Sequence, residues 1–226
     1  MKKWLVLGVA LAVAFAFVAC KKKEVPTVAT AGTAAGTAAV APPPETPLAL
    51  SPEAQKLPKG TKVAVMELEK GGVVEIELLE KETPKTVANF VDLVNGKLYD
   101  NLPVHRVEDF VVQTGDDEKA NELHPGIKLD VEKDKRKCVR GAVSMARSMA
   151  PGATTYGDTS PSEFFILKKD SPHLDPDFCV FGMVLGDGMK VVDGIQLNDV
   201  IKRVGVLTVG EEAAPTTAKE ATPAKK

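Results

Sequence analysis

A single arginine, Arg106, stands among residue types that could form a small apolar site. It lies in the segment Tyr99–Val107, and the following segment, Phe110–Asp116, brings in an aromatic residue and a glutamine, Gln113. A guanidinium is permanently charged and presents a planar fork of N–H donors. Beside apolar side chains such a donor has a larger electrostatic effect than in water. Taken alone, an arginine such as Arg106 more often forms a surface ion pair than a catalytic group. Its role therefore depends on the residues around it.

Other candidate groups have weaker patterns. The three histidines, His105, His124 and His173, show no spacing typical of metal ligands, so we expect no metal site. We interpret His105 as a hydrogen-bonded structural residue. The pair Asp116–Asp117 is more typical of a solvated turn after a strand than of paired catalytic carboxylates.

Composition narrows the possible functions. The 226 residues carry 29 Lys and Arg against 31 Asp and Glu, a net charge of −2. A nucleic-acid-binding surface needs a basic excess, so we expect no nucleic-acid partner. Three cysteines cannot supply a disulfide-dense scaffold or a four-cysteine zinc site. We expect Cys138 and Cys179 to be buried thiols, and their pairing stays open because it depends on a distance that the sequence does not give.

The N-terminus predicts export and anchoring. Two lysines are followed by an apolar run from Trp4 to Ala19, which is short for a membrane-spanning helix and typical of a signal peptide over residues 1–19. The residues before Cys20 resemble the lipobox of bacterial lipoproteins, although Phe17 stands where a leucine-like residue is usual. The resemblance implies lipidation of Cys20. An ordinary signal peptide or an uncleaved anchor are the alternatives.

The rest of the chain divides into a linker, a domain and a tail. Residues 20–60 are rich in Ala, Thr and Pro without a regular period, which predicts a linker, and residues 210–226 predict a disordered tail. Residues 61–209 have the size of one domain. Residues 63–68 and 73–78 predict a hairpin around Gly71 and Gly72, and further short apolar runs such as 102–107 predict more strands. A helix is predicted from the N-cap Thr83 and Pro84 to a stop at Gly96, and a second short helix from Gly188. The pattern favours a mainly β fold, a closed barrel capped by helices.

Six blocks of this domain together resemble a known family. They are Thr83–Phe90, Tyr99–Val107, Phe110–Asp116, Gly141–Ala146, Ser162–Ile166 and Leu174–Val184. In order and spacing they resemble the cyclophilins, the cyclophilin-type peptidyl-prolyl isomerases, over residues 61–209. The resemblance implies an eight-stranded antiparallel β-barrel, closed and capped by two α-helices, with no cofactor and a proline-containing polypeptide as substrate.

The resemblance also implies roles for individual residues. Arg106 matches the catalytic arginine, and Phe165 is placed in the proline pocket while Phe164 belongs to the core. The substrate-contacting positions correspond to Phe110, Val111, Gln113, Ala146, Phe165, His173, Leu174 and Phe178.

These residue types suit the implied reaction. Rotation about an X–Pro bond has a barrier of about 18–20 kcal/mol and breaks no bond, so it needs no nucleophile or metal. The twisted amide loses resonance and its nitrogen gains a lone pair, to which a guanidinium can donate a hydrogen bond. An apolar wall strengthens this interaction and holds the proline ring.

Several positions depart from the family pattern. Val111 is smaller than the usual methionine, and His173 and Phe178 stand where many relatives have Trp and His. The tryptophan helps to bind cyclosporin, so we expect weak cyclosporin binding. Glu163 replaces a common glutamine, and the insert Arg147–Pro161 is longer than usual.

Two further functions remain open beside an isomerase that assists exported proteins. One is a proline-binding chaperone or scaffold module with little turnover, which the change at Val111 favours. The other is a structural envelope lipoprotein, which the presence of Arg106 and Gln113 disfavours. We expect a monomer in the cell envelope, lipid-anchored to a bacterial membrane through Cys20 with the domain outside the cytoplasm.

Overall fold

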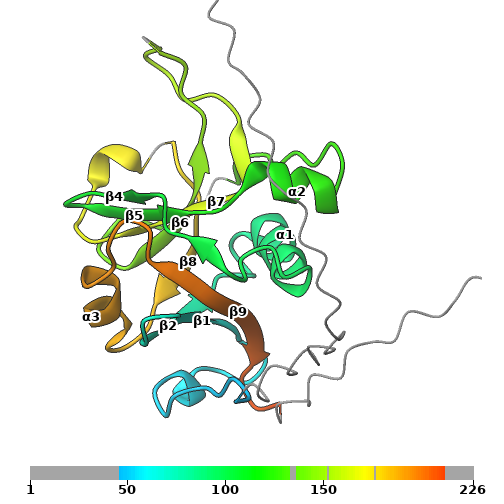
Figure 1. Cartoon of the computed structure of the whole chain (residues 1–226), viewed down its shortest axis with the longest axis vertical. Helices are drawn as coiled ribbons and strands as arrows, with labels where there is room; N and C mark the ends of the chain where they lie inside the picture. The colour runs from blue at the N-terminus through cyan, green and yellow to red at the C-terminus, as the bar shows by residue number, and fades with distance from the viewer. Residues whose placement is uncertain (1–45, 133–135, 152, 176, 212–226) are drawn as a thin grey trace, which may run out of the picture. The chain divides into compact units, whose positions relative to one another are not determined.

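Nine β-strands form one curled antiparallel sheet in the part of the chain that the structure describes (Figure 1). The computed structural model describes residues 46–132, 136–151, 153–175 and 177–211; the predicted signal peptide, Cys20 and nearly all of the predicted tail lie outside these residues. The strands are β1 Lys62–Leu68, β2 Val73–Leu78, β3 Leu102–Pro103, β4 Arg106–Val107, β5 Val111–Thr114, β6 Ala142–Arg147, β7 Thr159–Leu167, β8 Val180–Val184 and β9 Val200–Thr208. Their order across the sheet is β3-β9-β1-β2-β8-β6-β7-β5-β4.

The sheet differs from the expected closed barrel of eight strands, although it is mainly β as predicted. β3 pairs with β9 and β4 pairs with β5, so the sheet begins and ends at two short strands that do not pair with each other among the described residues. The apolar run 102–107, expected as one strand, is split between the two edges. Pro103 lacks an N–H to continue a ladder, and the chain crosses between the edges at Val104 and His105.

The first two strands form the hairpin that the sequence predicts. β1 and β2 pair antiparallel with Val65 opposite Glu75. Gly71 and Gly72 have φ angles of 92° and 103°, which non-glycine residues rarely adopt. A Cβ atom on Gly72 would also lie 2.9 Å from Val191 Cγ1, so the turn packs tightly against the last helix.

Helix α1, Pro84–Asn95, covers one side of the sheet (Figure 1). Pro84 occupies its first turn and Gly96 its C-cap, as predicted. The Thr83 hydroxyl is fully buried and donates to the Leu79 carbonyl rather than capping the helix. Among the described residues, no helix is both long enough and apolar enough to span a bilayer.

Two shorter helices complete the fold, so that residues 46–211, as far as they are described, contain three α-helices where two were expected. Helix α2, Asp117–Leu123, begins where we predicted a solvated turn. Asp116 Oδ1 accepts from Lys119 N at 3.0 Å and caps this helix. Asp117 Oδ1 accepts from the hydroxyl of Ser162 at 2.7 Å and so ties the helix to β7. Helix α3, Gly188–Asp193, lies at the second predicted helix.

Four aromatic rings fill the core between α1 and the sheet. Phe90 lies 5.3 Å from Tyr99 and 5.2 Å from Phe181, centroid to centroid, and Tyr99 lies 5.5 Å from Phe164. All four are at most 1% exposed. Phe164 is therefore a core residue as predicted, and the aromatic content of the domain is shared between this core and a second cluster described below.

The domain begins earlier than the boundary at residue 61. The Leu48 side chain packs on Gly205 of β9, Ala54 is fully buried, and Ser51 donates to Glu75 from both its backbone N, at 2.6 Å, and its hydroxyl, at 2.5 Å. Residues 46–60, predicted as the end of the linker, are thus part of the folded unit. Their apolar residues follow no helical or strand period, which is why the sequence did not reveal them.

Candidate active site

Strand register brings four residues into one row across the sheet. Arg106 on β4 pairs with Gln113 on β5, Gln113 pairs with Phe165 on β7, and Phe165 pairs with Ser144 on β6. Directly paired residues of neighbouring strands present their side chains on the same face. The row therefore places Phe165, which is distant in sequence, on the same surface as Arg106 and Gln113.

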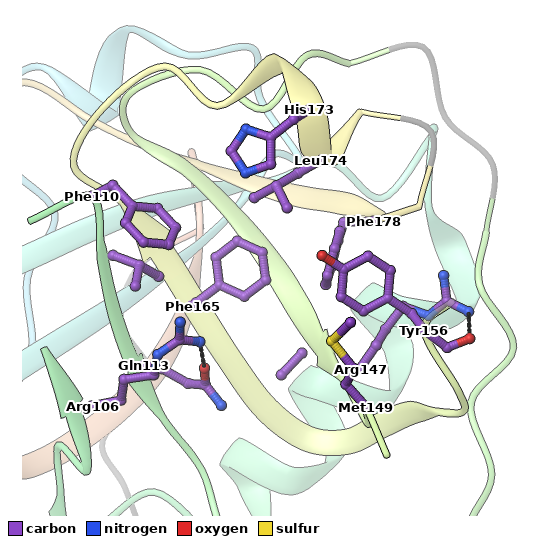
Figure 2. A pocket seen from close by; sticks show the side chains of 12 residues that line it. Arg106, Phe110, Gln113, Arg147, Met149, Tyr156, Phe165, His173, Leu174 and Phe178 are labelled. Atoms are coloured by element: carbon purple, nitrogen blue, oxygen red, sulfur yellow. Dashed lines mark hydrogen bonds between the residues drawn. The ribbon is translucent and has the colours of Figure 1, made fainter. Parts of the chain in front are cut away.

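This surface is hollowed into a cavity of about 280 Å³ (Figure 2). All nine residues predicted to form the site line it, and three further side chains complete the lining. The lining residues are Arg106, Phe110, Val111, Gln113, Ala146, Arg147, Met149, Tyr156, Phe165, His173, Leu174 and Phe178.

Arg106 is held at one end of the cavity by two polar neighbours. Its Nε donates to Glu108 Oε1 at 2.7 Å, and its Nη1 donates to Gln113 Oε1 at 3.0 Å. The hydrogen bond from Arg106 lowers the pKa of the Glu108 carboxyl, which is therefore ionised at neutral pH. The guanidinium carbon lies 6.0 Å from the centroid of the Phe110 ring. No described residue accepts a hydrogen bond from Arg106 Nη2, so this donor is available to a ligand.

Gln113 is oriented from its other side by Glu163. Gln113 Nε2 donates to Glu163 Oε2 at 2.9 Å. A carboxylate can only accept, so the amide nitrogen turns toward Glu163 and the amide oxygen toward Arg106. Glu163, noted in the sequence as a departure from the family, thus belongs to the network that positions the arginine.

The wall of the cavity is apolar. Phe165 and Leu174 are 5% and 7% exposed, and Val111 is buried beside them in one cluster. The Phe178 ring stands edge-on to Phe165, 5.4 Å between centroids. Phe165 faces this cavity while Phe164 faces the core, as the alternation along a strand predicts.

His173 and Leu174 reach the cavity from a short 3-10 helix, Pro172–Leu174. The loop after it is anchored by Asp175, whose Oδ1 accepts from Cys138 N at 2.7 Å. This backbone hydrogen bond, with a further contribution from Lys137, lowers the pKa of Asp175. The side chain stays charged and keeps the loop in place.

Arg147, Met149 and Tyr156 line the cavity but were absent from the predicted site. They come from the end of β6 and from the insert that precedes β7. The unusual length of the insert was visible in the sequence, but its direction over the cavity was not.

Other candidate residues lie outside the cavity lining. His105 is exposed, and its Nε2 is 4.0 Å from Glu163 Oε2, too far for a hydrogen bond, so its prediction as a hydrogen-bonded residue is wrong. Cys138 and Cys179 are buried thiols, with Cys179 Sγ 3.8 Å from Thr86 Oγ1. In the described ranges no three His, Cys, Asp or Glu side chains gather as metal ligands would.

Comparison with known proteins agrees with this geometry. The family model of the cyclophilin-type peptidyl-prolyl cis-trans isomerases matches residues 63–216. A peptidyl-prolyl cis-trans isomerase of Helicobacter pylori is 36% identical over 148 residues, which cover 64% of this chain and 86% of that protein. Peptidyl-prolyl cis-trans isomerase B of Bacillus subtilis is 37% identical over 142 residues, covering 62% and 94%.

A solved structure shares the fold at lower sequence identity. The crystal structure of a cyclophilin-type isomerase of Cryptosporidium parvum superposes with a TM-score of 0.53 at 21% identity, covering 66% of this chain and 98% of that one. The chain described here therefore belongs to the cyclophilin-type peptidyl-prolyl cis-trans isomerases, and its enzymatic class is that of an isomerase.

Proposed function

We propose that Arg106 catalyses X–Pro rotation by donating a hydrogen bond from Nη2 to the prolyl nitrogen in the twisted state. The observation that carries this proposal is that Arg106 lines the cavity beside its apolar wall, while its Nη2 has no hydrogen-bond acceptor among the described residues. In the planar ground state the nitrogen lone pair is delocalised into the carbonyl and accepts poorly. The hydrogen bond forms fully only as the amide twists, so it lowers the barrier rather than the ground state.

The remaining residues prepare this interaction. Gln113 and Glu108 fix the guanidinium through Nη1 and Nε, so the donor is in place before the amide twists. Phe165 and Leu174 offer a dry surface on which the pyrrolidine ring packs, and burial of that ring contributes about 1–3 kcal/mol. A related Cryptosporidium cyclophilin was solved in the presence of the dipeptide Ala-Pro, which supports a proline-containing substrate for this chain.

The test compares Arg106→Ala with a matched arginine outside the cavity. Arg140 has a side chain 43% exposed, against 44% for Arg106, and likewise forms an ion pair, with Asp193 at 2.6 Å. We expect Arg106→Ala to lower kcat/KM on an X–Pro peptide by about 10²–10³-fold, the effect of losing one transition-state donor. Arg140→Ala should retain the wild-type value. Equal activity of both variants with the fold intact would refute the role of Arg106.

We further propose that the enzyme is a lipoprotein of the bacterial envelope that assists the folding of exported polypeptides. The support is in the sequence: the apolar segment 4–19 behind two lysines, the lipobox-like residues before Cys20, and the three cations Lys21–Lys23 that directly follow it and would face lipid headgroups once Cys20 is lipidated. Mass spectrometry of the mature N-terminal peptide should find Cys20 diacylated or triacylated as the first residue. An unmodified Cys20 within an intact N-terminal segment would contradict the anchor.

A further inference from the structure

We propose that the cavity contains a second subsite, formed by Met149 and Tyr156 and held by Arg147, which takes a large apolar or aromatic side chain of a residue next to the substrate proline. The inference rests on the proposed function, because it assumes that the proline ring packs against Phe165. Figure 2 shows the two parts of the cavity, with Arg106 and Phe110 at one end and Met149 and Tyr156 at the other.

The cavity is too large for a proline ring alone. Its volume is about 280 Å³, close to the lower end of about 300 Å³ for small-molecule sites. A pyrrolidine ring adds only three methylene groups to the backbone. The lining supplied by the insert therefore surrounds space that a second side chain can occupy.

A continuous row of rings joins the two parts. Phe165 is edge-on to Phe178 at 5.4 Å, and Phe178 is edge-on to Tyr156 at 4.6 Å. Neighbouring residues of a substrate have Cα atoms 3.8 Å apart. A side chain next to a proline on Phe165 can therefore reach Tyr156 without bending the substrate away from the cavity.

Arg147 fixes the insert in this position. Its guanidinium donates to the carbonyl of Asp177 at 2.7 Å, to Gly157 at 2.8 Å and to Tyr156 at 3.3 Å. It also lies 5.7 Å from the centroid of the Tyr156 ring. Since these contacts use Nε, Nη1 and Nη2, Arg147 joins the insert to the loop before β8 and has donors on all three nitrogens occupied by backbone carbonyls.

The Met149 and Tyr156 side chains supply apolar and aromatic surface to this part of the cavity. Met149 is 54% exposed, one of the few large apolar side chains of the described chain that are this accessible, and it stands at the cavity rim. Methionine adjusts its shape easily and packs well on aromatic rings. Together with the Tyr156 ring it favours aromatic or long aliphatic side chains over small or charged ones.

The experiment measures isomerisation of four peptides by the full chain in detergent, using NMR exchange between cis and trans forms. Ala-Phe-Pro-Ala and Ala-Ala-Pro-Phe place an aromatic residue before or after proline; Ala-Ala-Pro-Ala is the common reference, and Ala-Glu-Pro-Ala tests a charged residue. We expect the wild type to prefer a phenylalanine at one of the two positions. Tyr156→Ala should reduce the ratio of kcat/KM for that peptide to the reference by about tenfold, within the range for lost contacts in an apolar pocket.

Two further variants keep the test decisive. Met149→Ala should reduce the same ratio by a smaller factor and does not depend on how Tyr156→Ala folds, whereas Tyr156→Phe keeps the ring and should restore the ratio. Leu197→Ala is the matched control, because Leu197 is 58% exposed and lies outside the cavity. Ratios that stay at the wild-type value in both Tyr156→Ala and Met149→Ala would refute the subsite while leaving the isomerase intact. Absence of exchange with every peptide in the wild type would refute the proposed function itself.

Discussion

Replacing Gln113 by leucine should impair catalysis through Arg106 while leaving the fold intact. Leucine is similar in size but cannot accept the hydrogen bond from Arg106 Nη1, which measures 3.0 Å. It also removes the amide Nε2, which donates a hydrogen bond to Glu163 Oε2 at 2.9 Å. The guanidinium would then keep only its bond to Glu108 and could rotate about it.

The size of the effect follows from the exposure of this bond. A hydrogen bond to a charged group contributes about 1.5–3 kcal/mol to stability when buried. The Arg106 side chain is 44% exposed, so water replaces part of the lost interaction and the lower end of that range applies. A loss of about 1.4 kcal/mol in the transition state corresponds to a tenfold lower rate. We therefore expect kcat to fall about tenfold with little change in KM, because the proline wall is untouched.

A protease-coupled isomerisation assay, with thermal unfolding measured in parallel, checks this expectation. Gln196→Leu makes the same exchange outside the cavity lining, at an exposed position, and serves as the control. The reasoning would be refuted by a Gln113→Leu variant with wild-type kcat. A rise in KM at constant kcat would also contradict it, since it would mean that Gln113 binds substrate without positioning the arginine.

Three other predictions concern stability and ligand binding. Ser51→Ala removes the hydrogen bond to the buried Glu75 carboxylate and should lower Tm by roughly 5 °C in a calorimetric scan. A hydrogen bond to a charged group contributes about 1.5–3 kcal/mol, and about 1 kcal/mol shifts Tm by about 2–4 °C in a domain of this size. An unchanged Tm would mean that the contact of the N-terminal segment through Ser51 does not stabilise the domain. Arg203 donates to Glu67 at 2.7 Å and lowers the pKa of that carboxyl from its usual 4.5, so the stabilisation is present above pH 4.5 and is lost as pH falls below it through the lowered pKa. Urea midpoints should therefore drop on acidification, and Glu67→Gln should make the drop smaller; an identical pH profile in the variant would contradict this. Cyclosporin should bind weakly if the resemblance rightly places His173 where many cyclophilins carry a tryptophan. Nanomolar binding in a calorimetric titration would show that this correspondence is wrong.

The sequence predicted the parts of the fold that local patterns determine. The first hairpin follows from the Gly71–Gly72 turn, and α1 follows from Pro84 and its apolar stripe. Helix α2 was missed because its stability depends on contacts with β7, above all through Asp117. Local sequence patterns also did not predict that the sheet stays open. Whether it closes depends on where the chain crosses from one edge strand to the other.

The lining of the cavity was predictable as far as the resemblance extended, whereas the catalytic and binding roles of these residues stay predictions. Each residue that it assigned to the pocket lines the cavity, because strand register preserves the row from Arg106 to Phe165. Tyr156 and Met149 lie on an insert that the family pattern does not describe. Their place over the cavity depends on the contacts of Arg147, which join segments distant in sequence.

The central claim is that this chain accelerates X–Pro rotation through Arg106, and NMR exchange spectroscopy on a single proline peptide tests it most directly. At equal occupancy of the peptide, the wild type should produce cis/trans exchange peaks, and Arg106→Ala should bind the peptide but lose these peaks. Broadened peptide resonances without cis/trans exchange peaks in the presence of the wild type would identify a proline-binding module with little turnover. Equal exchange rates in the wild type and in Arg106→Ala would show that catalysis does not depend on this arginine.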